Sequence, residues 1–120
     1  MNRGFERAHR VADLIQKTLA PLLLQEMRDE QFHLVTITHV VVTRDLSYAK
    51  VFISLLTDEA DEIKTTISAL NGAAKTFRYQ LAKAIKLRIV PELKFVYDDT
   101  AARGFRISTL IEAVTKDTKK

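Results

Sequence analysis

The spacing of apolar residues divides the chain into helical and extended segments. From residue 5 to 27, apolar side chains recur every three or four positions, which is the spacing of one helix face. They are Val11, Leu14, Ile15, Leu19, Leu22 and Leu23. Pro21 lies inside this run, and an internal proline removes one helical hydrogen bond and clashes with the preceding turn. We therefore predict a first helix with a kink at Pro21, or two shorter helices.

Two β-branched runs follow this helix. Residues 35–43 (VTITHVVVT) are typical of a strand, and residues 48–56 alternate between two faces. The apolar face of the second run carries Ala49, Val51, Ile53 and Leu55. Asp45, between the runs, favours a turn because its carboxylate can bond neighbouring backbone amides. The pair is therefore predicted to form a hairpin.

A second helix is predicted to begin at Thr57, since threonine is favoured at helix N-caps. Four acids follow within the first turn, where the helix dipole favours anions. They are Asp58, Glu59, Asp61 and Glu62. The dipole explains them sufficiently, so we assign them no catalytic or metal-binding role. Ile63, Ile67 and Leu70 are its predicted buried line, and Asn71-Gly72 is its predicted end.

A third helix should follow this break, with Phe77, Leu81 and Ile85 as its buried line. Pro91 prevents its continuation, and residues 93–97 then alternate as a strand does.

After a loop at residues 98–103, apolar spacing over residues 107–114 predicts a short final helix. Residues 115–120 form a polar tail that we expect to be flexible. The order is thus α-β-β-α-α-β with a terminal helix, a single α+β domain over residues 1–114.

Composition narrows the class of protein. The 120 residues are 47% apolar, which is ordinary for a soluble globular domain. No run approaches the roughly 20 apolar residues of a membrane span, and no secretory signal pattern is expected. The chain has no cysteine, which fits a reducing cytoplasm.

Charge is distributed unevenly along the chain. Residues 1–74 carry eight Lys or Arg and ten Asp or Glu, a net charge of −2, whereas residues 75–120 carry eleven and five, a net charge of +6. Such asymmetry favours a face that binds a polyanion, nucleic acid above all. Scattered solvated lysines are the alternative.

Sequence motifs for catalysis are absent. There is no phosphate-binding glycine loop, and the three histidines fall on three different predicted elements. We therefore expect neither an enzyme nor a metal site.

Several motifs together resemble the ribosome-binding factor A family. They are RVADLIQKTLAPLL (10–23), VTRDLSYAKVFIS (42–54), FRYQLAKAIKLRIVPELKFVYDDT (77–100) and GFRI (104–107). The resemblance covers nearly the whole chain. It implies a type II KH-like fold with a three-stranded sheet and its helices on one face. It also implies a monomeric, cytoplasmic, non-catalytic factor that needs no cofactor and binds the free small ribosomal subunit. Such factors assist late maturation of the subunit, including processing of the 5′ end of the small-subunit rRNA. They matter particularly for growth in the cold. In some bacteria a GTPase releases them from the subunit.

One position departs from the family pattern. The family pattern between the two central helices is similar to A-x-G. This chain has Ala73-Ala74-Lys75 there, so Lys75 stands in place of the expected glycine. Gly72 is then the residue left to form the kink.

Basic side chains are the predicted phosphate contacts, and Tyr79 is placed to stack on an unpaired base. The predicted contacts are Arg3, Arg7, Arg10, Lys75, Lys83, Lys86 and Arg88. Arg78 lies nearer the apolar side and is the candidate for a structural ion pair. A KH-like module for single-stranded DNA or mRNA and a small α+β enzyme are the alternative functions.

Overall fold

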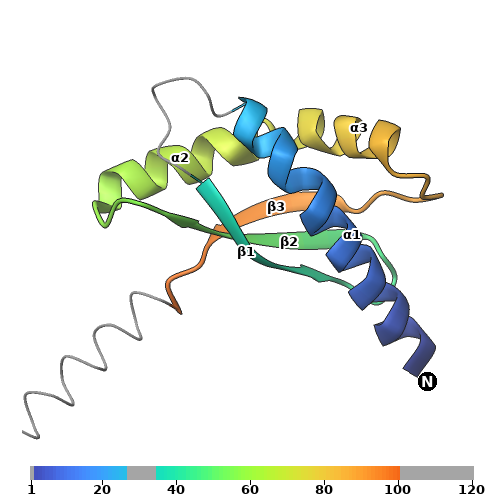
Figure 1. Cartoon of the computed structure of the whole chain (residues 1–120). Coiled ribbons are helices and arrows are strands. Elements are labelled where there is room, and N and C mark those ends of the chain that lie inside the picture. Colours follow the sequence, from blue (N-terminus) through green and yellow to red (C-terminus); the bar gives the residue numbers. More distant parts are fainter. Residues whose placement is uncertain (1, 27–34, 101–120) are drawn as a thin grey trace, which may run out of the picture.

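The computed structural model describes residues 2–26 and 35–100, with side chains for residues 4–25 and 35–100. Its elements follow the predicted order (Figure 1). They are α1 (Asn2–Glu26), β1 (Val35–Val42), β2 (Tyr48–Leu55), α2 (Ala60–Gly72), α3 (Ala74–Ala84) and β3 (Glu92–Tyr97). The predicted α+β fold of the KH-like type is confirmed.

The three strands form one sheet in the order β1-β2-β3. β1 and β2 are antiparallel, which confirms the predicted hairpin, and a bulge interrupts β1 between Ile37 and His39. β3 runs parallel to β2, so α2 and α3 form the crossover that parallel strands require. Asp45 stabilises the hairpin turn as predicted, because its carboxylate accepts hydrogen bonds from the Thr43 hydroxyl at 2.7 Å and the Ser47 amide at 3.1 Å.

All three helices pack on the same face of the sheet (Figure 1). α1 lies against β1, whereas α2 and α3 lie against β3. The hydrophobic core lies between the helices and the sheet. It contains the predicted apolar residues of the helices and the strand side chains that point toward the helices. Its largest fully buried side chains include Phe77, Phe95, Ile15, Leu19, Ile53 and Leu81.

α1 continues through Pro21 as one helix, so a split into two helices is wrong. Pro21 and Lys17, whose carbonyl loses its helical partner, are both exposed, and water can therefore solvate that carbonyl. Leu19 and Leu23, on either side of the proline, are 0% and 1% exposed and hold both parts of the helix on the core.

The start of α2 differs from the prediction. The helix begins at Ala60 with Glu59 as its N-cap, whereas Thr57 was predicted to be the cap. The Thr57 hydroxyl instead accepts a hydrogen bond from the Glu59 amide at 3.2 Å and donates one to Glu62. A local bond of this kind holds threonine just outside the helix.

The buried line of α2 is only partly the predicted one. Leu70 is fully buried, but Thr66 is the other buried residue, and Ile63 and Ile67 are half-buried. This helix lies over β3 at the edge of the sheet, so a wider part of its surface remains in solvent.

The break between α2 and α3 lies at Ala73, one residue after the predicted Gly72. Ala73 has φ −97° and ψ 5°, and its amide bonds the carbonyls of both Ala69 and Leu70 at 3.1 Å. Gly72 does not adopt a positive φ, so the break does not depend on the conformational freedom of glycine. Lys75 therefore occupies the first turn of α3 without backbone strain.

The GFRI motif, the predicted final helix at 107–114 and the tail at 115–120 lie outside the described residues. The proposed domain limits of 1–114 remain a prediction. Among the helices that the structure describes, none combines the length and apolar character needed to cross a membrane.

Candidate nucleic-acid interface

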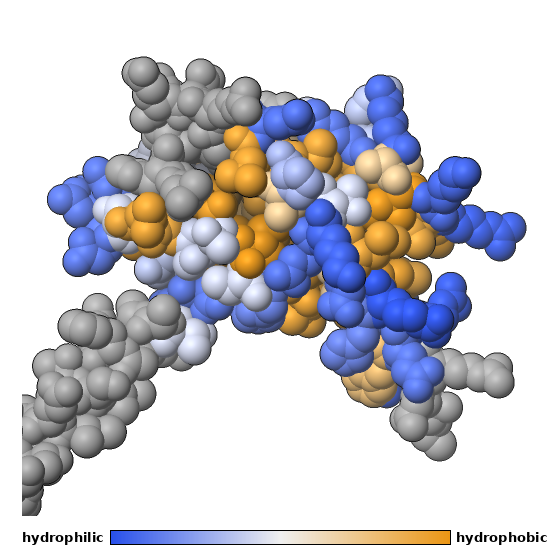
Figure 2. All heavy atoms as spheres, viewed as in Figure 1, coloured by the Kyte–Doolittle hydropathy of each residue, from blue (hydrophilic) through white to orange (hydrophobic). Residues whose placement is uncertain are grey.

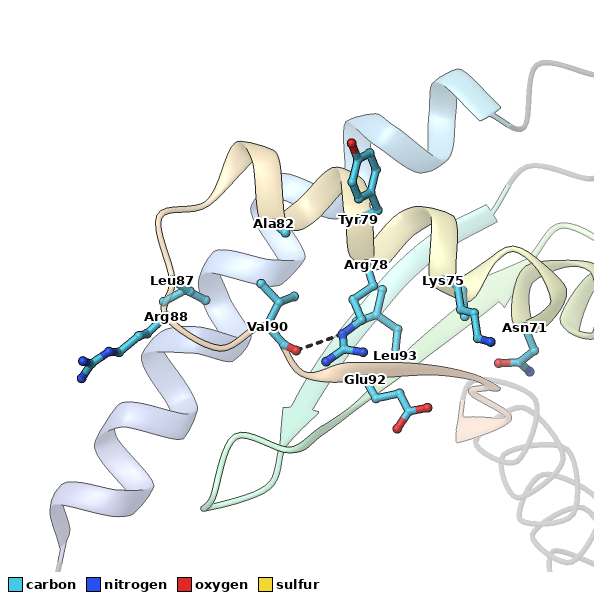
Figure 3. A pocket seen from close by; sticks show the side chains of 11 residues that line it. Asn71, Lys75, Arg78, Tyr79, Ala82, Leu87, Arg88, Val90, Glu92 and Leu93 are labelled. Atoms are coloured by element: carbon cyan, nitrogen blue, oxygen red, sulfur yellow. Dashed lines mark hydrogen bonds between the residues drawn. The ribbon is translucent and has the colours of Figure 1, made fainter.

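A groove lies between α3 and β3, which we call the α3 groove (Figure 3). Its volume is about 610 Å³. Its lining includes Asn71, Lys75, Arg78, Tyr79, Arg88 and Glu92. Four of these six side chains are cationic or aromatic, and one is an acid, so the groove favours an anionic ligand.

Arg78 has a structural role, but with a different partner from the predicted acid. Its Nε donates a hydrogen bond to the Val90 carbonyl at 3.1 Å (Figure 3). This bond ties α3 to residues 85–91, which we call the α3–β3 loop. Arg78 also lines the groove, so it contributes positive charge to it.

Asn71 connects the helix break to the edge of the sheet. Its Nδ2 donates to the Phe95 carbonyl at 3.0 Å, and its Oδ1 accepts from the Phe95 amide at 2.8 Å. We call this pair of bonds the Asn71 clamp. It satisfies backbone groups that an edge strand leaves unpaired, and it fixes the first turn of α3 beside β3. The sequence signalled Asn71 only as a helix breaker.

A second groove lies between α1 and the α3–β3 loop, which we call the α1 groove. Its volume is about 600 Å³. It is lined by Arg7, Arg10, Val11, Leu14, Leu46, Leu87, Arg88 and Ile89. Figure 2 shows hydrophilic side chains over the N-terminal half of α1 beside hydrophobic surface near that loop.

The structure brings only some predicted contacts together. Arg7, Arg10 and Arg88 line the α1 groove, and Arg88 lines the α3 groove as well, together with Lys75. Arg88 therefore joins the two grooves at the tip of the loop, where its side chain extends outward (Figure 3). Arg3 lies in the first turn of α1, but its side chain is outside the described residues.

Lys83 and Lys86 are exposed and line neither groove. The Lys83 ammonium lies 4.5 Å from the centre of the Tyr79 ring, in a cation–π arrangement. Tyr79 is 62% exposed, so its opposite ring face remains accessible to a base. In a similar contact, the Arg44 guanidinium lies 4.0 Å above the Phe5 ring and ties the hairpin turn to α1.

A polar cluster lies on the other side of the sheet, near the end of β3. Asp98 accepts hydrogen bonds from the Thr100 amide at 2.9 Å and from the Thr38 hydroxyl, and His39 lies 3.7 Å away. The bonds from Thr100 and Thr38 lower the pKa of Asp98 to about 2. Among the described residues, no group of three His, Cys, Asp or Glu side chains is placed to hold a metal ion.

Comparison with known proteins decides the family. The family model described as ribosome-binding factor A matches residues 7–111. The chain belongs to the ribosome-binding factor A family. A ribosome-binding factor A of Pseudomonas fluorescens is 46% identical over 99% of this chain and 91% of its own length.

Solved structures of ribosome-binding factor A share the fold. A putative member from Thermotoga maritima, solved by NMR, is 34% identical, has a TM-score of 0.61, and aligns over 75% of this chain and 85% of its own. A homology model of the Thermus thermophilus ribosome-binding factor A, fitted into the cryo-EM map of a 30S–RbfA complex, has a TM-score of 0.65 at 24% identity. That alignment covers 77% of this chain and 94% of the other.

Proposed function

We propose that this protein binds the free small ribosomal subunit through its rRNA and assists late maturation, including processing of the 5′ end of that RNA. Membership of the ribosome-binding factor A family supports this proposal. A family member from Thermus thermophilus is described in a complex with a 30S particle, which supports the same particle as the partner here.

The observation that carries the RNA contact is the meeting of the two grooves at Arg88. Lys75 on one side and Arg7 and Arg10 on the other extend the basic surface across both grooves. A guanidinium presents a planar fork of donors that matches a phosphate, so a run of such groups suits a sugar-phosphate backbone.

The mechanism is stoichiometric. The protein binds one conformation of the immature rRNA more tightly than the others, and this difference in affinity shifts the population toward the form that can be processed. It requires no cofactor and no catalytic residue of its own. We further propose that it acts as a cytoplasmic monomer, matters most in cold growth, and is released by a GTPase where the host has one.

Depletion of the protein in its host tests this role. Depleted cells should accumulate small-subunit rRNA with an unprocessed 5′ end, most strongly at low temperature, and wild-type protein should restore processing. The triple variant Arg7→Gln, Arg10→Gln, Arg88→Gln should fold and fail to restore it. Normal 5′ ends in depleted cells would contradict the maturation role. Trimming of precursor RNA by the purified protein alone would instead indicate an enzyme.

A further inference from the structure

Three arginines from two distant segments converge on the α1 groove. Arg7 and Arg10 are three residues apart on α1 and so lie on one helix face, and Arg88 approaches from the α3–β3 loop. No hydrogen bond or ion pair joins any of the three to another residue in the described part of the chain. The groove lining contains no acid. Its positive charge is therefore not neutralised by the groove itself.

The floor of the same groove is apolar and open to solvent. Leu14 is 40% exposed and Ile89 is 57% exposed, although both are large aliphatic side chains. Val11, Leu46 and Leu87 extend this floor. An apolar patch rimmed by charged groups marks a binding surface more often than isolated exposed apolar residues do.

Leu46 has an unusual backbone conformation at this site. It adopts φ 62°, the only positive φ among the described non-glycine residues. A leucine in this region is strained, and the Leu46 amide bond to the Thr43 carbonyl at 2.9 Å holds the turn in place. The turn thereby places an apolar side chain against the groove where a glycine would leave a gap.

Arginines around an apolar floor favour a ligand that carries both a phosphate and an apolar face. A fully paired RNA helix presents phosphates that can bind the arginines, but its bases stay stacked inside the helix. It would therefore leave the apolar floor of the groove exposed to water. An unpaired nucleotide presents both a phosphate and the face of a base. The groove volume of about 600 Å³ also lies within the range of sites that enclose small ligands.

We propose that the α1 groove holds an unpaired nucleotide of the bound RNA. Its backbone phosphates lie on Arg7, Arg10 and Arg88, and its base lies against Leu14 and Ile89. This inference rests on the proposed function and deepens it, because it makes the protein a reader of unpaired positions in immature rRNA. The site differs from the α3 groove, which lies beside the helix break.

Two RNA hairpins test the proposal, one with a single-nucleotide bulge and one fully paired in the same sequence. Wild-type protein should bind the bulged hairpin about tenfold more tightly, the gain expected if the base removes roughly 55 Å² of the apolar floor from water. The double variant Leu14→Ala, Ile89→Ala should lose this preference and keep its affinity for the paired hairpin. Leu24→Ala is the matched control, because Leu24 is 54% exposed on the same helix and lies outside the groove. Circular dichroism confirms that each variant is folded.

The possible outcomes separate this inference from the proposed function. Equal binding of both hairpins by a wild-type protein that still binds small subunits overturns the unpaired-nucleotide site and leaves the proposed function intact. If the double variant keeps its bulge preference but binds small subunits less tightly, the groove holds a protein segment and the inference is wrong. Failure of the wild-type protein to bind small subunits at all contradicts the proposed function itself.

Discussion

Replacing Asn71 by alanine tests whether the Asn71 clamp fixes the helix break to the sheet. The variant loses the two hydrogen bonds to Phe95, at 3.0 and 2.8 Å. Each contributes about 1 kcal/mol net, whereas alanine recovers about 0.5 kcal/mol through its higher helix propensity. The free energy of unfolding should therefore fall by about 1–2 kcal/mol. For a domain of this size, that corresponds to a decrease in Tm of roughly 5–10 °C.

Thermal unfolding followed by circular dichroism measures this loss, and amide exchange locates it. The Phe95 amide should exchange faster in the variant, because it loses its hydrogen-bond acceptor, whereas the Val51 amide in the central strand should change only with global stability. Ser68→Ala is the matched control, since Ser68 is exposed one turn earlier on α2. A Tm of Asn71→Ala within about 1 °C of wild type would refute the clamp, as would an equal loss in Ser68→Ala.

Three further predictions concern charge. Arg7→Gln with Arg10→Gln should reduce the salt dependence of RNA binding, lowering the slope of log K against log salt by about 1.4, or 0.7 per lost phosphate contact; an unchanged slope in a filter-binding titration would remove both residues from the interface. Lys75→Glu should weaken small-subunit binding more than Lys83→Glu, because only Lys75 lines a groove, and equal effects in a pelleting assay would contradict this difference. The pKa of Asp98 is lowered to about 2 from an ordinary value of 3.8. Its ionised form therefore stabilises the fold above about pH 4, and this contribution is lost as the pH falls toward 2. Urea unfolding from pH 2 to 7 should show a shallower acid loss in Asp98→Asn than in wild type, and identical profiles would contradict it.

Most of the fold was predictable because apolar periodicity is set by local geometry. The period of 3.6 identified Phe77, Leu81 and Ile85 as one buried line, and all three are buried, although α3 itself ends at Ala84 and Ile85 is its C-cap. The predictions failed where a side chain had a choice of local partners. Thr57 bonds the Glu59 amide and stays outside the helix, although its residue type also suits an N-cap.

The candidate site was predictable in its charge and only partly in its geometry. Arg7 and Arg10 were predicted as phosphate contacts, and their spacing of three residues puts them on one helix face, but nothing local shows that the loop carrying Arg88 folds against that face. The same limit applies to the Asn71 clamp, whose partner Phe95 is 24 residues away. Contacts of this kind depend on tertiary packing, and sequence spacing alone does not encode them.

Co-sedimentation with purified ribosomal particles tests the central proposal most directly. Wild-type protein is mixed with small subunits, large subunits and joined ribosomes at low and high salt, in parallel with the triple variant Arg7→Gln, Arg10→Gln, Arg88→Gln. We predict salt-sensitive binding of the wild-type protein to free small subunits alone, and a marked loss of binding in the variant. Equal binding to all three particles would contradict the proposal and leave a general polyanion-binding protein of the same fold.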